Sequence, residues 1–484
     1  MHIDISQNNL IDNLNKYLEW HNMPVKVNKA GICNALITIY TKYVLEGKEH
    51  EIMDLLSYVA GKKPCSEMEY EVNHFIIKII LKLYPEHFDK QLNQTSSIET
   101  QYINNKPLKP IFQLPLVTLD KNWEKIIADI KLGKDEVMTI GGFNHIVAVT
   151  RKEGRYVIFD PNYESGKKVF ANESSLVHEL HTKIFHFRTN EMGLDINLIR
   201  HPDKDLKDRS SLPKVQDIYN IYLGTSHVSK CASIGSITGS TLTIAAKYNN
   251  SEPIEILLNL GERNTENISL AAALAVKNNN PNVLMALIDH LTKKQLKELF
   301  ILSLICGRKE IVDSFLTTDS VREFYNESLQ DPVLFICAAE GGNLLLLKKV
   351  IEDSKKLNNL DDIKIAEIIH QKNNTEDTIM AGIRSNNTAC LRFLLSQFEK
   401  VNFNLSEVRK MDYLVLAINK NQPQMVSLLI KGLSKEHLQT ITLTLSAIQK
   451  TDLRILYLLE ENGINFSETA KAVIAQKKHI PDRK

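Results

Sequence analysis

A cysteine, a histidine and an aspartate occupy positions in this chain from which they could act together. Cys33 follows Gly31-Ile32 and begins a helical pattern of apolar residues, while His145 opens one β-branched segment and Asp160 closes the next. A cysteine in the first turn of a helix meets unpaired N–H groups and the positive end of the helix dipole, which favour a thiolate. A histidine can take the thiol proton, and a carboxylate can orient the imidazole ring. These residue types predict nucleophilic catalysis by a thiol.

The two segments that carry His145 and Asp160 are expected to pair as a β-hairpin. Residues 145–150 and 155–162 are rich in β-branched and aromatic side chains, and Gly154 lies in the loop between them. Antiparallel pairing brings the start of one strand beside the end of the next. The pattern therefore predicts contact between the histidine and the aspartate.

Each of the three residues has a plainer interpretation when it is taken alone. A cysteine on an apolar helix commonly fills core space, and an aspartate before a proline is typical of a turn. A histidine at a strand start often only satisfies a local hydrogen bond. The order and spacing of Cys33, His145 and Asp160 together favour an assembled triad.

Other histidines and cysteines lack the spacing of a metal site. His178, His181 and His186 have no glutamate in the arrangement of a zinc-binding helix, and no cysteine pair lies near them. We therefore expect neither a metal nor a cofactor. Residues 178–188 are expected to add a strand, because their aromatic and β-branched side chains suit a sheet.

Length and composition indicate several globular domains without a charged binding surface. The chain has 484 residues, of which 43% are hydrophobic and 24% charged, and its net charge is +1. This balance gives no electrostatic basis for binding nucleic acid or a membrane surface. Six cysteines over this length form no disulfide framework, which is typical of a reducing compartment. The N-terminal residues lack the pattern of a secretory signal peptide, and no apolar run is long enough to predict a membrane span.

The sequence pattern divides the chain into three regions. Residues 1–195 mix helical and strand patterns, with a turn-rich, proline-containing connection at 96–115. Residues 196–239 are polar and rich in breakers, which predicts a linker or bridging segment. From residue 240 to 484 a pattern returns: small residues in a first helix, Gly or Asn at a turn, and an apolar second helix. The clearest copy is Phe335–Asn343, followed by a Leu-Leu pair.

Both halves resemble known families. Gly31-Ile32-Cys33, Asn144-His145 and Phe159–Asn162 are similar to motifs of the papain-like cysteine peptidases, in particular of their secreted bacterial effector branch. The repeated segment resembles the ankyrin repeat. The resemblance implies an α+β papain-like N-terminal domain followed by an all-α ankyrin-repeat solenoid of about six to seven degenerate repeats. That family also uses an amide a few residues before the cysteine to hold the oxyanion, and Asn28 is the nearest amide in this sequence.

A papain-like domain joined to ankyrin repeats is similar to the Legionella-type ankyrin-repeat effectors. The resemblance implies a virulence factor that leaves the bacterium through a type IV secretion system and works in the host cytoplasm, with the nucleus as a second location. There the repeats would hold a host protein, and the triad would act on it as a thiol hydrolase. Peptidase activity is the first expectation.

Two other activities fit the same sequence. Deamidation or transglutamination uses the same triad with a different acceptor, and a non-catalytic ankyrin scaffold would retain an inactive protease-like domain. Host ankyrin proteins are often hydroxylated on an asparagine in the loop after the second helix, and Asn402 matches that position best.

Overall fold

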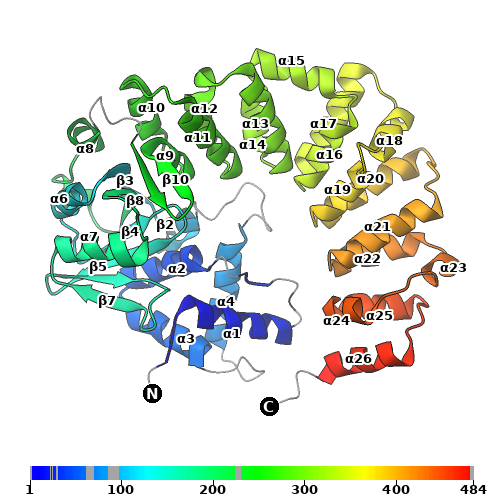
Figure 1. The fold of residues 1–484 in the computed structure, drawn as a ribbon, viewed down its shortest axis with the longest axis horizontal. Helices are drawn as coiled ribbons and strands as arrows, with labels where there is room; N and C mark the ends of the chain where they lie inside the picture. Colours follow the sequence, from blue (N-terminus) through cyan, green and yellow to red (C-terminus); the bar gives the residue numbers. More distant parts are fainter. Residues whose placement is uncertain are drawn as a thin grey trace. The chain divides into compact units, whose positions relative to one another are not determined.

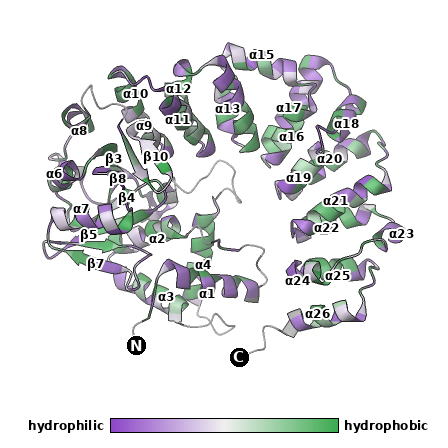
Figure 2. Ribbon diagram, in the orientation of Figure 1, coloured by the Kyte–Doolittle hydropathy of each residue, from purple (hydrophilic) through white to green (hydrophobic). Residues whose placement is uncertain are grey.

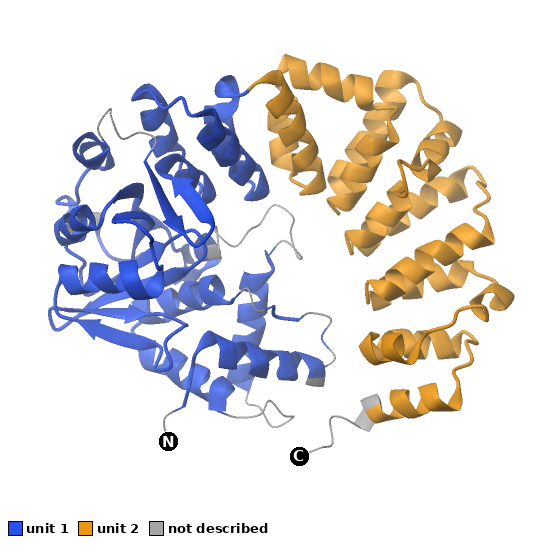
Figure 3. Ribbon diagram, viewed as in Figure 1, with its two compact units in different colours: residues 1–291 blue, residues 292–484 orange. Residues whose placement is uncertain are grey.

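The chain folds into two compact units, residues 1–291 and 292–484 (Figure 3). The computed structural model describes residues 3–21, 23, 26–28, 31–61, 70–85, 97–223 and 230–479. The first unit contains a mixed α/β region and the first two helix pairs of a long helical array, and the second unit contains the rest of that array (Figure 1). Residues 241–479 are called the helical array below.

A six-stranded antiparallel sheet lies at the centre of the first unit, in the order β3-β8-β4-β5-β6-β7. Its strands are β3 (Pro110–Leu119), β4 (Glu136–Gly141), β5 (Ile146–Lys152), β6 (Arg155–Phe159), β7 (Lys167–Phe170) and β8 (Glu191–Arg200). Two short hairpins flank it, β1 (Tyr102–Ile103) with β2 (Lys106–Pro107), and β9 (Cys231–Ile234) with β10 (Ile237–Ser240). Every residue of β4 is buried, and β5 is coloured as hydrophobic in Figure 2. Such central strands are mostly apolar because both of their faces are covered.

The predicted hairpin is confirmed as β5 and β6. Their register runs from Ala148 opposite Phe159 to Lys152 opposite Arg155. Glu153 and Gly154 form the turn with φ of 50° and 77°. Two successive positive φ values are those of the tight turn that matches the twist of a hairpin.

Helices from the N-terminal part of the chain share one core with the sheet. They are α1 (Gln7–Trp20), α2 (Cys33–Leu45), α3 (Glu49–Gly61) and α4 (Tyr70–Leu83), followed beyond β3 by α6 (Asp120–Ile130) and later by α7 (Glu173–Glu179) and α8 (Val215–Tyr222). The core of α1 to α4 includes Phe159 at the end of β6. The Tyr40 ring of α2 stacks on the Phe159 ring with 4.0 Å between centroids. The helix that begins at Cys33 is therefore packed against the end of the strand that precedes Asp160.

Two sequence predictions are wrong in this region. Residues 178–188 do not form a strand, because α7 continues into a π-helical turn, Leu180–Ile184. Asn172 starts helix α7 with a capping box. This helix-start signal outweighed the strand preference of the aromatic residues that follow. The connection predicted at 96–115 includes the start of β3, which tolerates Pro110 and Pro115 because it is an edge strand paired only with β8.

Residues 196–239, predicted as a linker or bridge, pack on the sheet where they are described. Strand β8 runs on to Arg200. The Arg209 Nε atom lies 2.9 Å from Oε1 of the buried Glu136. The Tyr219 hydroxyl donates a hydrogen bond of 2.7 Å to the Pro115 carbonyl. These contacts make the segment part of the first unit.

The helical array consists of successive helix pairs at the places where the sequence pattern repeats. The pairs are α9 (Thr241–Lys247) and α10 (Ser251–Asn259), α11 (Thr265–Lys277) and α12 (Pro281–Leu287), α13 (Lys293–Ile305) and α14 (Lys309–Phe315), α16 (Pro332–Glu340) and α17 (Leu344–Asn358), α19 (Thr378–Arg384) and α20 (Thr388–Lys400), α21 (Glu407–Asn419) and α22 (Pro423–Leu429), and α24 (Leu445–Lys450) and α25 (Leu453–Glu461). Additional helices are α15 (Asp319–Ser328), α18 (Asp362–His370), α23 (Lys435–Leu438) and α26 (Glu468–His479). None of the helices described is long and apolar enough to cross a membrane.

The turns inside most of these pairs have the same backbone conformation. A residue with left-handed φ separates the two helices at Asn249, Asn279, Gly307, Gly342, Asn386 and Asn421. In three pairs the next residue is an asparagine whose side chain donates to a carbonyl of the preceding pair, at 2.8 Å each: Asn280 to Ala246, Asn343 to Gly307, and Asn387 to Gly342. These bonds connect neighbouring pairs through the backbone as well as through apolar packing.

Candidate active site

The sheet and helix α2 bring the three predicted catalytic residues together. Cys33 is the first residue of α2, His145 directly precedes β5, and Asp160 directly follows β6. Helix α2 packs on β4 and β5, so its N-terminus lies at the same end of the hairpin as the histidine. The predicted contact between His145 and Asp160 is confirmed, with 2.8 Å between Nε2 and Oδ1.

Burial and hydrogen bonds hold the imidazole in one orientation. His145 is 9% exposed and Asp160 1% exposed. The Asn162 backbone N–H donates to the same Oδ1 atom of Asp160 at 2.8 Å, and the Asn162 side-chain nitrogen lies 3.3 Å from His145 Nε2. Nε2 faces the carboxylate, which leaves Nδ1 as the ring nitrogen available to the Cys33 thiol, and the thiol and the imidazole interact electrostatically.

The electrostatics favour a thiolate–imidazolium pair. Burial acts to raise the pKa of the Cys33 thiol, but the hydrogen bond and the charge of His145 outweigh it, so that this pKa lies below its usual value. Burial likewise acts to lower the pKa of His145, but hydrogen bonds to Asp160 and Cys33 raise it to about 9. A thiolate forms at neutral pH when its proton acceptor is held in this way, and the thiolate is the nucleophilic form of cysteine.

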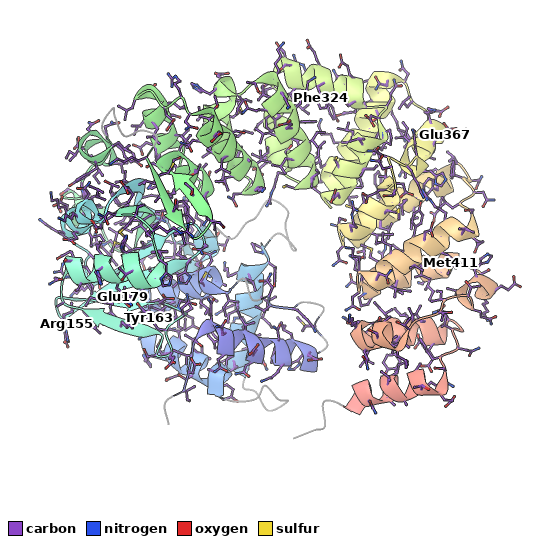
Figure 4. All side chains as sticks on the ribbon, viewed as in Figure 1. Arg155, Tyr163, Glu179, Phe324, Glu367 and Met411 are labelled. Atoms are coloured by element: carbon purple, nitrogen blue, oxygen red, sulfur yellow. The ribbon has the colours of Figure 1, made fainter. Side chains whose placement is uncertain are left out.

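A tight turn fixes the position of Asp160. The Asp160 N–H donates to the Gly166 carbonyl and its own carbonyl accepts from the Tyr163 N–H, both at 3.0 Å. The Tyr163 hydroxyl donates to Glu179 Oε1 of α7 at 2.8 Å, and the two residues are labelled beside each other in Figure 4. The carboxylate therefore belongs to a braced turn, and its direction does not depend on the histidine alone.

Gln7 is a site residue that the sequence reasoning missed. Its Oε1 accepts from the Ile32 N–H at 3.2 Å, its side-chain nitrogen donates to Asn162 Oδ1, and its N–H donates to the Pro161 carbonyl at 2.6 Å. It thus connects the residue before Cys33 with the turn after Asp160. Gln7 lies 26 positions before the cysteine in the sequence, and no local pattern marks it.

Gly31 allows this approach. Its φ is +110°, which only glycine adopts without strain, and a Cβ atom built there would lie 2.9 Å from Gln7 Oε1. Both the backbone conformation and the close packing of Gln7 therefore require a glycine at position 31.

A small cavity is lined by the residues that follow the nucleophile and the histidine in the sequence. Its volume is about 80 Å³, and its lining includes Asn34 and Ile146, which directly follow Cys33 and His145. Side-chain amides of Gln113 and Asn197 and the Tyr248 side chain also line it. A cavity that combines apolar walls with a few polar groups can orient a small polar group of a ligand.

The structure also describes the other residues predicted from the sequence. Asn28 is exposed, and its proposed part in the oxyanion hole stays a prediction. Asn402 is exposed with φ of +49°, in the turn after α20, which is the loop position predicted for it. His181 Nε2 lies 2.7 Å from the Thr189 carbonyl. Among the described residues no group of three or more His, Cys, Asp or Glu side chains could hold a metal ion.

Comparison with known proteins gives no further guide to the site. No protein-family model matches the chain, and no curated protein matches it either. The function is therefore argued from the arrangement of Cys33, His145 and Asp160.

Proposed function

We propose that the first unit is a papain-like thiol hydrolase with the triad Cys33, His145 and Asp160. The observation that carries the proposal is the orientation of the imidazole: Asp160 Oδ1 lies 2.8 Å from Nε2, and the ring interacts with a thiol at the start of a helix. A buried cysteine with only a packing role does not need a hydrogen-bonded histidine with a pKa raised to about 9.

The chemistry follows from these positions. The Cys33 thiolate attacks the carbonyl carbon of an amide, so a C–S bond forms and the carbonyl electrons move to oxygen. N–H groups in the first turn of α2 have no intrahelical acceptor and can stabilise that oxyanion. The His145 imidazolium gives its proton to the departing amine as the C–N bond breaks. Water then attacks the thioester, loses a proton to His145, and releases the acid and the thiol.

The side-chain amide that assists the oxyanion is proposed to be Gln7 rather than Asn28. Gln7 contacts the Ile32 N–H directly before the nucleophile, whereas Asn28 is exposed. Replacing Gln7 by alanine should lower turnover by about a hundredfold to a thousandfold, the range for loss of one donor. Asn28→Ala is the matched control, and the reverse ranking of the two variants would contradict the assignment.

The test of the triad is covalent labelling with a thiol-directed activity probe, read by intact mass. Rapid labelling at one site is expected in the full chain, absent in Cys33→Ala and strongly slowed in His145→Ala. Labelling of Cys33 no faster than of the other five cysteines would contradict a catalytic thiol and favour a scaffold. With candidate substrates, chain cleavage identifies a peptidase, and conversion of a side-chain amide identifies deamidation or transglutamination.

We further propose that the helical array is an ankyrin-type solenoid that holds a protein partner. The paired helices, their left-handed turn residue and the asparagine bonds between pairs support this assignment. On the resemblance to Legionella-type effectors, the partner is a host protein and the chain acts inside the host cell after type IV secretion. Capture of the same host protein by wild type and by Cys33→Ala is expected, because binding and chemistry use different parts of the chain.

Asn402 is proposed as a hydroxylation site in that setting. It is exposed and lies in the turn after a second helix, where a modifying enzyme can reach it. Mass spectrometry of the protein recovered from host cells should show one added oxygen at Asn402. Unmodified peptide throughout the recovered protein would contradict the hypothesis.

A further inference from the structure

The first helix of the helical array is fastened to the sheet at both of its ends. Ser240 caps α9 with a capping box, and Thr241 Oγ1 accepts from the Val117 N–H of β3 at 2.8 Å. At the other end the Tyr248 carbonyl accepts from the Gln113 side chain, also of β3, at 3.1 Å. Helix α9 and the sheet belong to the same compact unit. The residues at the end of α9 therefore have a fixed position relative to the active site.

Lys247, the last residue of α9, is half-buried and packs against the loop that leads to the catalytic histidine. Its Nζ donates to the carbonyls of Gly142 and Phe143, both at 2.9 Å. The Tyr248 hydroxyl donates to the same Gly142 carbonyl at 2.9 Å. The Gly142 N–H in turn donates to the His145 carbonyl at 2.8 Å, which closes the turn. Three hydrogen bonds from Lys247 and Tyr248 thus hold the backbone that precedes His145.

Glycines in this loop leave room for that contact. A Cβ atom at Gly141 would lie 2.3 Å from the Tyr248 hydroxyl, and one at Gly142 would lie 2.8 Å from the Phe185 ring. The Phe185 ring itself lies 6.2 Å from the His145 ring, between centroids. The repeated Gly141-Gly142 sequence is therefore explained by the close approach of α9 on one side and of an aromatic neighbour of the histidine on the other.

Lys247 is also a charge close to the nucleophile. Burial lowers its pKa to about 8, while the charges of Cys33 on α2 and Asp195 on β8 favour the ammonium form. Burial raises the pKa of Asp195 to about 7, so this carboxyl neutralises Lys247 only in part at neutral pH. The centroid of the Tyr248 ring lies 4.8 Å from Lys247 Nζ, a cation–π contact. Below pH 8 the Lys247 ammonium therefore favours the thiolate form of Cys33, in addition to the effect of His145.

We propose that Lys247 is a positioning residue of the thiol site, which holds the turn before His145 and supplies a positive charge that favours the Cys33 thiolate. The inference rests on the proposed thiol chemistry and extends it. It means that the first helix pair of the array is part of the catalytic apparatus, while later pairs are left to bind a partner.

The test is the pH dependence of Cys33 alkylation by a neutral reagent such as iodoacetamide, read by intact mass on the full chain. In Lys247→Met the apparent pKa of the thiol should rise by about one unit, because a nearby charge is lost. Alkylation at pH 6.5 should then be about tenfold slower than in wild type, with the rates converging near pH 10. Lys277→Met is the matched control, because Lys277 ends α11 in the next pair and is exposed.

A second variant separates the effect of the Lys247 charge from that of its hydrogen bonds to the turn before His145. Lys247→Gln keeps an amide donor for the carbonyls but loses the charge, so its alkylation midpoint should rise as in Lys247→Met. Folding of each variant is checked by the tryptophan fluorescence unfolding transition. A folded variant with the wild-type pH midpoint overturns the inference, and so does a rate that falls equally at every pH, which indicates a structural role only. If wild-type Cys33 itself reacts no faster than the other cysteines, the proposed function fails instead.

Discussion

Glu49, the first residue of α3, connects the nucleophile helix to the sheet. Its Oε1 accepts from the Tyr40 hydroxyl of α2 at 2.8 Å and from Lys167 Nζ of β7 at 2.6 Å, and its Oε2 is paired with Lys152 of β5. Burial acts to raise the pKa of Glu49, but these three donors lower it from its usual value of 4.5 to about 2. The carboxylate therefore stabilises the fold, and Glu49→Gln is expected to weaken it.

The magnitude follows from the pKa difference between the folded and unfolded states. A depression of about 2.5 units corresponds to about 3.4 kcal/mol, and screening at the partly exposed lysines reduces this to about 2 kcal/mol. Because the folded-state pKa of Glu49 is the lower one, the contribution is fully present above pH 4.5 and is lost as the pH falls towards 2. The deficit of the variant should thus be about 2 kcal/mol at pH 7 and less than half of that at pH 3.

Urea unfolding, followed by tryptophan fluorescence, measures the unfolding free energy of the first unit, which contains Glu49. Both tryptophans, Trp20 and Trp123, belong to residues 1–291, so the signal reports the first unit. Glu46→Gln is the control, because its pair with Lys42 at 3.9 Å is solvated and worth less than about 0.5 kcal/mol. Equal stability of Glu49→Gln and wild type at pH 7, or a deficit that stays the same at pH 3, would refute the reasoning.

Three further substitutions test other parts of the structure. Asp160→Asn removes the carboxylate that keeps His145 protonated. Labelling of the Cys33 thiol at pH 7.5 should therefore fall by about tenfold or more and recover near pH 10. An unchanged pH profile would show that the His145–Asp160 pair is not needed. Gly31→Ala forces a strained φ and a close contact with Gln7, and should lower the unfolding free energy of the first unit by about 1–3 kcal/mol in urea titrations; full stability would argue against the strained conformation. Asp377→Asn removes a fully buried partner of an arginine on α21 and should cost the second unit about 3 kcal/mol by circular dichroism, with a smaller change in tryptophan fluorescence; equal shifts in both signals would contradict a local effect.

Patterns of short range could be predicted from the sequence. The β5–β6 hairpin and the contact of His145 with Asp160 follow from alternation of side chains and from one turn, because register fixes which ends meet. The helix pairs of the array follow from a repeated pattern of small and apolar residues. Helix α2 could be predicted from Cys33 onward because its apolar residues recur at helical spacing.

Contacts between distant segments could not be predicted in this way. Gln7 reaches the site from the start of α1, and Lys247 from beyond the segment predicted as a linker. Strand β3 was missed because its prolines suggest turns, and only its edge position in the sheet makes them acceptable. A sequence pattern reports the local preference of the chain, whereas these positions are decided by which segments pack together.

The attachment of α9 to β3 has a consequence for how such a chain could arise. A recombination event that joined an ancestral enzyme to a ready-made array at residue 240 would have left the Val117 N–H and the Gly142 carbonyl without the partners that α9 now provides. The pairs from α13 onward belong to the second compact unit, which begins at Thr292. Exchange of arrays between related genes is therefore expected to preserve the first two pairs with the enzyme and to vary the chain after them.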